Sequence, residues 1–114
     1  MPLLHKIFRS SANFLLQQEW AKDVAAKTDG RVEVDLLPVE TIVAHTESQD
    51  AVAAGIIDGH VTDTSYFAGK EPAFGLIANP VGAWSDPQQM FDFMENGGGN
   101  ELMNEMLEPY GLHF

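Results

Sequence analysis

A run of hydroxyl and aromatic side chains follows the third predicted strand of the chain and is the pattern best suited to binding a small molecule. It contains Ser65, Tyr66 and Phe67. A serine pair, Ser10 and Ser11, follows the first predicted strand in the same way. In an open α/β sheet, ligands bind outside the carboxyl ends of the strands, and hydroxyl groups beside aromatic walls suit a small organic ligand. We therefore take these five residues as candidate ligand-binding residues, with ordinary loop packing as the alternative interpretation.

The other chemical patterns in the sequence are weak. The chain has no cysteine, which excludes a disulfide scaffold, a zinc site made of thiolates and a cysteine nucleophile. No two of its four histidines have the H-x3-H spacing that places two metal ligands on one helix face. No serine lies in the G-x-S-x-G turn of a hydrolase, and no Asp-rich calcium loop is present. We therefore predict no catalytic residue, no metal site and no cofactor.

The glycine run at residues 97–99 has two interpretations. It stands before a predicted helix, whose free N–H groups could hold an anion. It matches neither the Walker pattern nor G-x-G-x-x-G, so we favour a corner between two antiparallel helices. The Met- and Phe-rich helices on either side of it are interpreted as packing into a core rather than lining a pocket.

The composition and charge limit the partners of the chain. Of its 114 residues, 45% are hydrophobic and 20% are charged, which is typical of one globular domain. Six bases against seventeen acids give a formal net charge of −11, which makes nucleic acid and anionic membrane surfaces poor partners. Five of the bases lie in residues 1–32, whereas residues 33–114 hold fourteen acids and only one base, Lys70. No apolar stretch approaches the ~20 residues of a membrane-spanning helix, so we expect no membrane insertion.

Residues 1–64 alternate between strand and helix patterns. Strands are expected at residues 3–8, 31–37 and 59–64, because these stretches are short and either apolar or alternating. One helix is expected to open at residues 10–13 and to end at residues 28–30, and a second to run from residues 46–49 to Ile57. Helices of this length between strands imply right-handed crossovers. We therefore predict an α/β fold with a three-stranded, mainly parallel β-α-β-α-β sheet.

Residues 65–114 have a different pattern, for which we expect a loop, a short strand and a C-terminal helical pair. The loop is rich in aromatic and turn residues, and the apolar run Phe74–Val81 is taken as the strand. Asp86 followed by Pro87 predicts the start of one helix, and residues 100–108 are expected to form the other. Both parts are predicted to belong to a single domain, residues 1–114.

Four segments of the chain carry a family resemblance. They are Thr28-Asp-Gly-Arg-Val-Glu-Val34, Asp50-Ala-Val-Ala-Ala-Gly-Ile-Ile-Asp58, Ser65-Tyr-Phe-Ala-Gly-Lys-Glu-Pro-Ala-Phe74 and Gly97-Gly-Gly-Asn-Glu-Leu-Met-Asn-Glu105, the last followed by Tyr110-Gly111. The chain resembles the extracytoplasmic solute-binding proteins of TRAP (tripartite ATP-independent periplasmic) transporters, and the 2-oxo-acid-binding type fits best. The first two segments are generic for that family, whereas the last two are more specific. The resemblance covers nearly the whole chain.

The resemblance implies the first lobe of a two-lobed periplasmic solute-binding protein. In that family an arginine in the second lobe pairs with the substrate carboxylate, and no residue of this chain matches it. The positions that match the family's cleft wall are Ser65, Tyr66 and Phe67, and more weakly Ser10 and Ser11. We interpret residues 1–114 as a single truncated lobe. Without a recognisable signal peptide it is cytoplasmic as encoded, and it is periplasmic if it follows the family.

Two functional hypotheses follow from these observations. The first is a non-enzymatic protein that resembles a TRAP-type solute-binding protein and binds a small organic carboxylate weakly. The second is a protein-interaction or structural module that has lost solute binding. Because a lone lobe exposes a sheet edge and an apolar face, we also expect a homo-oligomer, with a dimer favoured. An enzyme is disfavoured, because no catalytic constellation is present.

Overall fold

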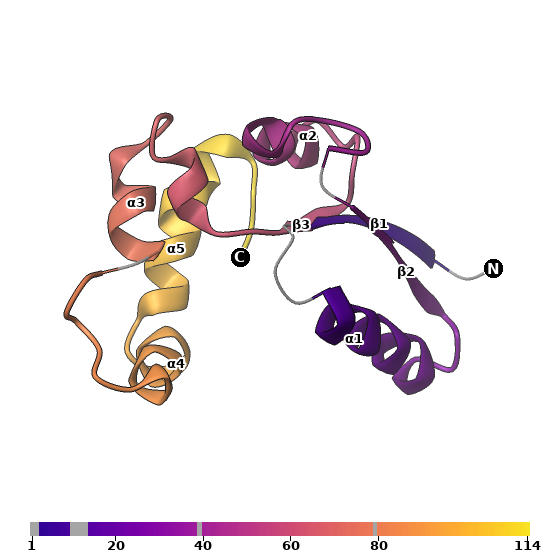
Figure 1. The fold of residues 1–114 in the computed structure, drawn as a ribbon, viewed down its shortest axis with the longest axis horizontal. Coiled ribbons are helices and arrows are strands. Elements are labelled where there is room, and N and C mark those ends of the chain that lie inside the picture. Colours follow the sequence, from indigo (N-terminus) through magenta and orange to yellow (C-terminus); the bar gives the residue numbers. More distant parts are fainter. Residues whose placement is uncertain (1–2, 10–13, 39, 79) are drawn as a thin grey trace. The chain divides into compact units, whose positions relative to one another are not determined.

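A computed structural model of the chain describes residues 3–9, 14–38, 40–78 and 80–114. The chain forms two compact units, Met1–Thr62 and Asp63–Phe114 (Figure 1). The sequence predicted a change of character after residue 64, close to this division. Each unit has its own buried cluster of apolar side chains. No helix among the described residues is long and apolar enough to span a lipid bilayer.

The first unit contains a sheet with helices between its strands. Its elements in chain order are β1 (Leu3–Arg9), α1 (Phe14–Lys27), β2 (Val32–Leu37), the 3-10 helix η1 (His45–Glu47), α2 (Ser48–Ala53) and β3 (Gly59–Val61). All strands are parallel and β1 is central, since Leu3 pairs with Val32 of β2 and Ile7 pairs with Gly59 of β3. The α/β class predicted from the sequence is therefore confirmed.

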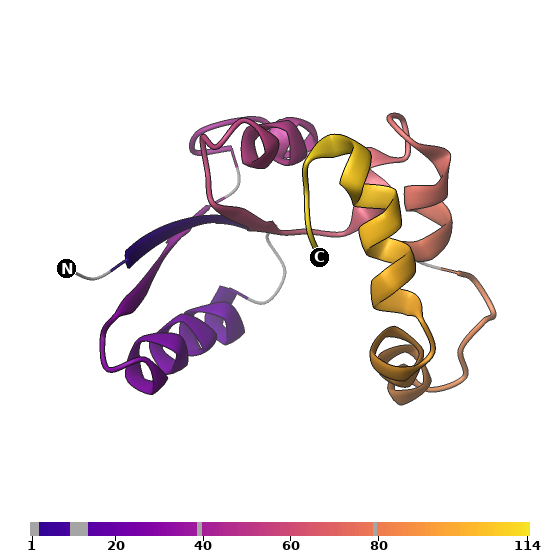
Figure 2. The same ribbon diagram turned by 180° about the vertical axis from the view of Figure 1, so that it is seen from behind.

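The strand order β2-β1-β3 determines where the helices lie. The chain crosses from β1 to β2 in one direction, then returns past β1 to reach β3 on its other side. Connections between parallel strands are almost always right-handed, so crossings in opposite directions place their helices on opposite faces of the sheet. Figures 1 and 2 show α1 on one face and α2 on the other. The buried core on the α2 side is built on Ala51 and Ile57.

The two helices of this unit end at left-handed glycines. Gly30 follows α1 with φ of +71°, as the sequence predicted, and its N–H donates to the carbonyl of Ala25 at 2.8 Å. Helix α2 ends at Ala53, earlier than the predicted end at Ile57. The chain turns at Gly55, where φ is +72°, and this turn brings Ile57 into the core at 2% exposure.

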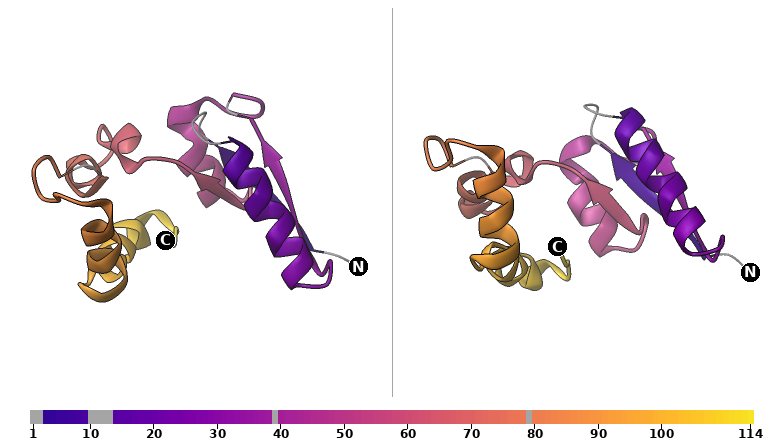
Figure 3. Two further views of the ribbon diagram at one scale, coloured as in Figure 1. Left: turned by 60° about the horizontal axis from the view of Figure 1, so that its bottom comes forward. Right: turned by 90° about the horizontal axis from the view of Figure 1, so that it is seen from below.

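The second unit is helical. Its elements are the 3-10 helix η2 (Thr64–Phe67), α3 (Pro72–Ala78), α4 (Pro87–Asn96), α5 (Gly99–Leu107) and the 3-10 helix η3 (Glu108–Tyr110). Its core is formed by four buried side chains, Phe67, Phe74, Met103 and Leu107. Figure 3 gives two further views of α4 and α5 and of the corner between them. The prediction of a C-terminal helical pair is confirmed.

The short strand predicted over Phe74–Val81 is wrong, because most of this run belongs to helix α3. Pro72 occupies the first turn, where a helix needs no N–H donor. The Glu71 carboxylate accepts a hydrogen bond from the backbone N–H of Ala73 at 3.2 Å, which satisfies another free donor. Phe74 and Ile77, three positions apart, both pack in the core, so the apolar run has a helical period.

The corner between α4 and α5 follows the predicted pattern. Asp86 caps α4, and its carboxylate accepts from the N–H of Gln88 at 2.7 Å. The glycine run ends α4 at Gly97 and begins α5 at Gly99, and φ at Gly98 is +90°. A Cβ atom at Gly99 would lie 2.8 Å from the Cα of Met94, so a larger residue does not fit there. These glycines therefore form the corner that the sequence favoured.

Candidate ligand-binding site

The carboxyl edge of the first unit's sheet is the place where this topology offers a site. The connections run in opposite directions from β1, so the topological switch point lies between β1 and β3. Residues 10–13, which follow β1, lie outside the described residues, and so do the candidates Ser10 and Ser11. Thr62 follows β3 directly. The residues that approach Thr62 therefore define the candidate site.

Two histidines at this edge are each hydrogen-bonded to a hydroxyl side chain. His45, which opens η1 after β2, has its Nε2 atom 3.0 Å from the hydroxyl oxygen of Thr62. His60, in β3, has its Nδ1 atom 3.0 Å from the hydroxyl oxygen of Ser48. Ser48 also donates to the backbone carbonyl of His45 at 2.8 Å, which links the two pairs. We call these four residues, His45, Ser48, His60 and Thr62, the edge cluster.

The hydrogen-bond pattern favours one tautomer of His60. A hydroxyl group has a single hydrogen, and that of Ser48 goes to the carbonyl of His45. The contact between Ser48 and His60 is satisfied when Nδ1 of His60 carries the hydrogen and donates it to the hydroxyl oxygen. The cluster then holds its two imidazoles in fixed orientations.

Burial keeps His60 uncharged. Desolvation, assisted by the nearby imidazole of His45, lowers the pKa of His60 from 6.5 to about 4. At neutral pH its ring is therefore a neutral donor and acceptor. The Ser48 side chain is fully buried, at 0% exposure, so its hydroxyl is closed to a substrate and does not act as a nucleophile. The edge cluster is suited to hydrogen bonding rather than to covalent chemistry.

Gln49, next to Ser48 in α2, adds an unusual polar group. Its side chain is 1% exposed, and its Oε1 atom has no hydrogen-bond partner among the residues that the structure describes. Unsatisfied buried oxygens are uncommon in folded proteins. Nothing near Gln49 identifies a ligand for it.

The segment after β3 contains the other residues predicted from the sequence. Ser65 and Tyr66 are exposed in η2, where the N–H of Ser65 donates to the Asp63 carboxylate at 2.8 Å. Phe67, by contrast, is 3% exposed and packs against Phe74 in the core of the second unit. Phe67 is therefore a core residue and does not form an open wall for a ligand. Ser65 and Tyr66 remain available as candidates.

His45 and Thr62 were missed by the sequence reasoning. The histidines were searched for metal-ligand spacing, and seventeen positions separate His45 from Thr62. Position marked His45 only as a residue in the loop after the second predicted strand, and it did not mark Thr62, because the third predicted strand ran to residue 64 whereas β3 ends at Val61. Among the described residues, no group of three or more His, Asp or Glu side chains could hold a metal ion.

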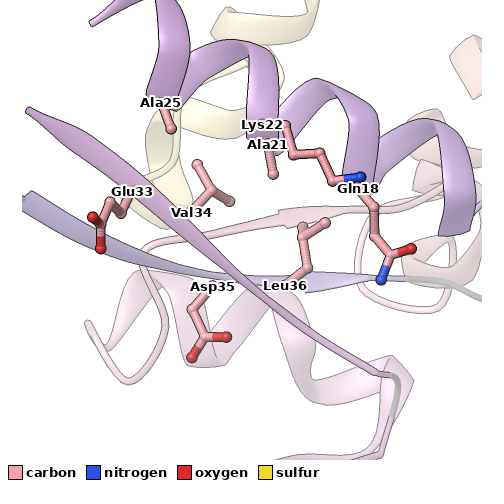
Figure 4. Close-up of a pocket in the computed structure, with 8 residues that line it drawn as sticks. All are labelled: Gln18, Ala21, Lys22, Ala25, Glu33, Val34, Asp35 and Leu36. Carbon is pink, nitrogen blue, oxygen red and sulfur yellow. The ribbon is translucent and has the colours of Figure 1, made fainter. Parts of the chain in front are cut away.

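An open hollow of about 560 Å³ lies between α1 and β2. Figure 4 shows Val34 and Leu36 pointing toward Ala21 and Ala25 of the helix. The acidic side chains of β2 point to the other face of the strand, as the alternation of a strand requires. The hollow is lined by Gln18 and Lys22 of α1 as well as by these apolar side chains, and it lies along the middle of β2, away from the carboxyl edge of the sheet where this topology offers a site.

This packing leaves the large side chains of α1 in solvent. The spacing of Leu16, Trp20 and Val24, with Ala21 and Ala25 beside them, predicts one apolar stripe on this helix, but only part of that stripe meets the sheet. Ala21 and Ala25 face β2. Leu16 is 68% exposed and Trp20 is 45% exposed, and Leu15 beside them is also exposed. Three large apolar side chains thus lie on the outside of α1.

A comparison with protein families identifies the class of protein. Residues 8–114 match the model for the bacterial extracellular solute-binding protein, family 7 (DctP). The chain therefore belongs to this family of solute-binding proteins, and the resemblance to TRAP solute-binding proteins is confirmed.

Individual relatives agree with this assignment. One is a TRAP periplasmic solute-binding protein from Rhodobacter sphaeroides, solved in an apo open state, which is 58% identical in sequence and has a TM-score of 0.93. The match covers 97% of this chain and 36% of the Rhodobacter chain. A monocarboxylate 2-oxoacid-binding periplasmic protein from Nostoc sp. is 31% identical over 105 residues, which are 91% of this chain and 28% of that protein.

A more distant relative shows the same fold. It is a TRAP periplasmic solute-binding protein from Pseudoalteromonas atlantica with bound sodium and pyruvate. It is 22% identical with a TM-score of 0.82, over 97% of this chain and 35% of its own. The chain thus spans about a third of the length of these relatives.

Proposed function

We propose that this chain binds a small organic carboxylate, in the manner of a solute-binding protein and without catalysing a reaction. The observation that carries this proposal is the 58% identity and TM-score of 0.93 to a TRAP solute-binding protein over 97% of the chain. The Nostoc relative is a 2-oxoacid-binding protein, and the Pseudoalteromonas relative holds pyruvate with sodium. A 2-oxo acid such as pyruvate is therefore the first ligand to test.

The edge cluster supplies suitable groups for such a ligand. A carboxylate accepts hydrogen bonds, and the imidazole of His45 and the hydroxyl of Thr62, which are hydrogen-bonded to each other at 3.0 Å, could exchange that contact for contacts to a ligand. We propose that these two residues contact the ligand, while Ser48 and His60 hold His45 in place. The exposed residues Ser65 and Tyr66 are kept as additional candidates.

The expected affinity is low. A charge-assisted contact between a base and a carboxylate is stronger than one between neutral groups, and His60 is neutral at pH 7. Beyond residue 32 the only base is Lys70, whose Nζ atom lies over the ring of Tyr110, 5.3 Å from its centroid. The chain also carries a net charge of −11, which opposes the approach of an anion.

A thermal-shift assay tests this proposal. The purified chain is heated with 2-oxo acids, amino acids and dicarboxylates, each with and without sodium or calcium. A ligand at about 100 times its Kd stabilises the folded state by about 2.7 kcal/mol, so pyruvate is expected to raise the Tm. Thr62→Val should abolish the rise, whereas the exposed Thr46→Val should leave it intact. No rise with any compound would refute carboxylate binding, and a rise that survives Thr62→Val would refute the edge cluster as its site.

An oligomeric interaction module is the second candidate function. It is supported by the large apolar side chains that the structure leaves in solvent, among them Leu16, Leu76 and Val81. Large apolar side chains that gather on an exposed surface often mark a site of protein–protein contact. We propose that the chain self-associates, and sedimentation across the micromolar concentration range tests this independently of any ligand. A single monomeric species at every concentration would refute it.

A further inference from the structure

The second unit carries an open groove whose walls include most of its methionines. The groove has a volume of about 480 Å³ and lies between α3, the segment before α4, α4 itself and α5. Met90, Met94 and Met106 contribute to its walls, and all three are partly exposed. The fourth methionine of this unit, Met103, is 4% exposed and belongs to the core. The sequence favoured core packing for these Met-rich helices, and the structure shows that three of their methionines also line an open groove.

Methionine is the only side chain of this protein that contains sulfur. The chain has five methionines and no cysteine, so no thiolate competes with them for an oxidant. A thioether sulfur donates an electron pair to one oxygen of hydrogen peroxide, the O–O bond breaks, and the second oxygen leaves as water with the proton of the first. The sulfur is thereby oxidised by two electrons to the sulfoxide, and the peroxide is reduced by two.

The surroundings of the four methionines of the second unit shield them to different degrees. Met103 lies within the buried cluster, so peroxide reaches its sulfur only when the core opens. Met94 and Met106 line the groove and also pack against that cluster. Met90 lines the groove and is not among the described residues that pack against the cluster. The structure therefore ranks Met90 as the most accessible to peroxide and Met103 as the least.

Oxidation would change the packing at the corner between α4 and α5. A sulfoxide is polar, and a polar group that is buried without a hydrogen bond is unfavourable. A Cβ atom at Gly99 would lie 2.6 Å from the Sδ atom of Met94, so an oxygen bonded to this sulfur has little room on that side. Among the side chains that line the groove, only Trp84 has a polar hydrogen, and its indole nitrogen is itself buried. Sulfoxides at Met94 and Met106 should therefore weaken the packing of the second unit.

We propose that this groove is a site of methionine oxidation that loosens the second unit. Hydrogen peroxide converts Met90 first and Met94 and Met106 next, whereas Met103 stays reduced while the chain is folded. Oxidation at Met94 and Met106 lowers the stability of the unit. Enzymatic reduction of methionine sulfoxide reverses the change. The proposal depends neither on carboxylate binding nor on self-association.

Peptide mass spectrometry of the chain during exposure to dilute hydrogen peroxide tests the order of reaction. Cleavage before Asp92 separates Met90 from the other three methionines, and fragmentation of the remaining peptide locates the added oxygen. Met90 is expected to react about tenfold or more faster than Met103, because the latter has to wait for an opening of the core. In urea the four rates should become equal. Equal rates for Met90 and Met103 in the folded chain would overturn the site.

Urea unfolding of the oxidised protein, followed by circular dichroism, tests the consequence. Leucine conserves the volume and the apolar character of methionine, so a Met94→Leu, Met106→Leu double variant is expected to fold. Each protein is compared with its own unoxidised form. Oxidation should lower the urea midpoint of the unchanged protein and of the matched control Met90→Leu, and leave that of the double variant almost unchanged. An equal fall in the double variant, or no fall in the unchanged protein once Met94 and Met106 are oxidised, would refute the loosening of the second unit.

Discussion

Protonation of His60 should weaken the fold as the pH falls. The pKa of His60 is lowered from 6.5 to about 4 by burial and by the neighbouring His45. In the unfolded chain the imidazole binds a proton near pH 6.5, whereas the folded chain resists protonation until about pH 4. The stability that the neutral His60 contributes to the folded state is therefore fully present above pH 6.5, declines as the pH falls, and is lost below about pH 4.

The size of the effect follows from the change in pKa. A tenfold change in proton affinity corresponds to about 1.4 kcal/mol, so lowering the pKa from 6.5 to about 4 sets a ceiling of about 3 kcal/mol. His60 is only partly buried, and solvent screens part of this energy. We expect a loss of about 1–2 kcal/mol in unfolding free energy from this group between pH 7 and pH 4.

Urea unfolding of a matched pair isolates this contribution. The unchanged protein and His60→Asn are unfolded at several values of pH between 7 and 4. Asparagine keeps an N–H donor near the position of Nδ1 but does not titrate. The many carboxylates titrate in both proteins, so their effects cancel in the difference. His113→Asn, at an exposed histidine near the end of the chain, is the control.

The expected result is a steeper decline in stability for the unchanged protein than for His60→Asn, with His113→Asn following the unchanged protein. Parallel declines for the unchanged protein and His60→Asn would show that burial does not oppose the charge on His60. A decline that is steeper in His60→Asn would mean that the folded state favours the charged imidazole, contrary to the reasoning.

Two further substitutions test the second unit. Phe67→Ala should reduce the unfolding free energy by about 3–5 kcal/mol in urea titration, because Phe67 is 3% exposed, whereas Tyr66→Ala at an exposed position should cost far less. Equal losses would contradict the placement of Phe67 in the core. Gly99→Ala should cost about 1–3 kcal/mol, since its Cβ would meet Met94, and Gly69→Ala, with open space around it, should be neutral. A thermal-unfolding comparison in which Gly99→Ala matches Gly69→Ala would refute this.

The elements that could be predicted are those with a local cause. Asp86 marks the start of α4 because its carboxylate caps the helix, and Gly30 ends α1 because it adopts a left-handed conformation. Both signals depend on a few neighbouring residues. The order of strands and helices in the first unit follows from similar local patterns.

The features that escaped prediction depend on tertiary contacts. The apolar run from Phe74 is compatible with a buried strand or a buried helix, and packing against Met103 and Leu107 decides for the helix. The spacing on α1 places Leu16 and Trp20 in one apolar stripe with the two alanines, and only the fold shows that the alanines face β2 while Leu16 and Trp20 stay in solvent.

The candidate site shows the same limit. Its location at the carboxyl edge could be expected from the topology, and Ser65 and Tyr66 were chosen on that basis. The pairing of His45 with Thr62 joins loops that are far apart in the sequence, so only the fold reveals it. Phe67 was chosen for its aromatic ring, but in the structure that ring is buried in the hydrophobic core of the second unit.

The distribution of tryptophan gives the protein two optical reporters. The chain has two tryptophans, and one lies in each unit, Trp20 in the first and Trp84 in the second. Trp20 is partly in solvent, whereas the indole N–H of Trp84 is shielded beside Phe93. Their fluorescence should therefore differ in emission maximum, with Trp20 emitting at the longer wavelength. Replacing either one with phenylalanine leaves a single fluorophore, so the melting of each unit can be followed separately in the same intact chain.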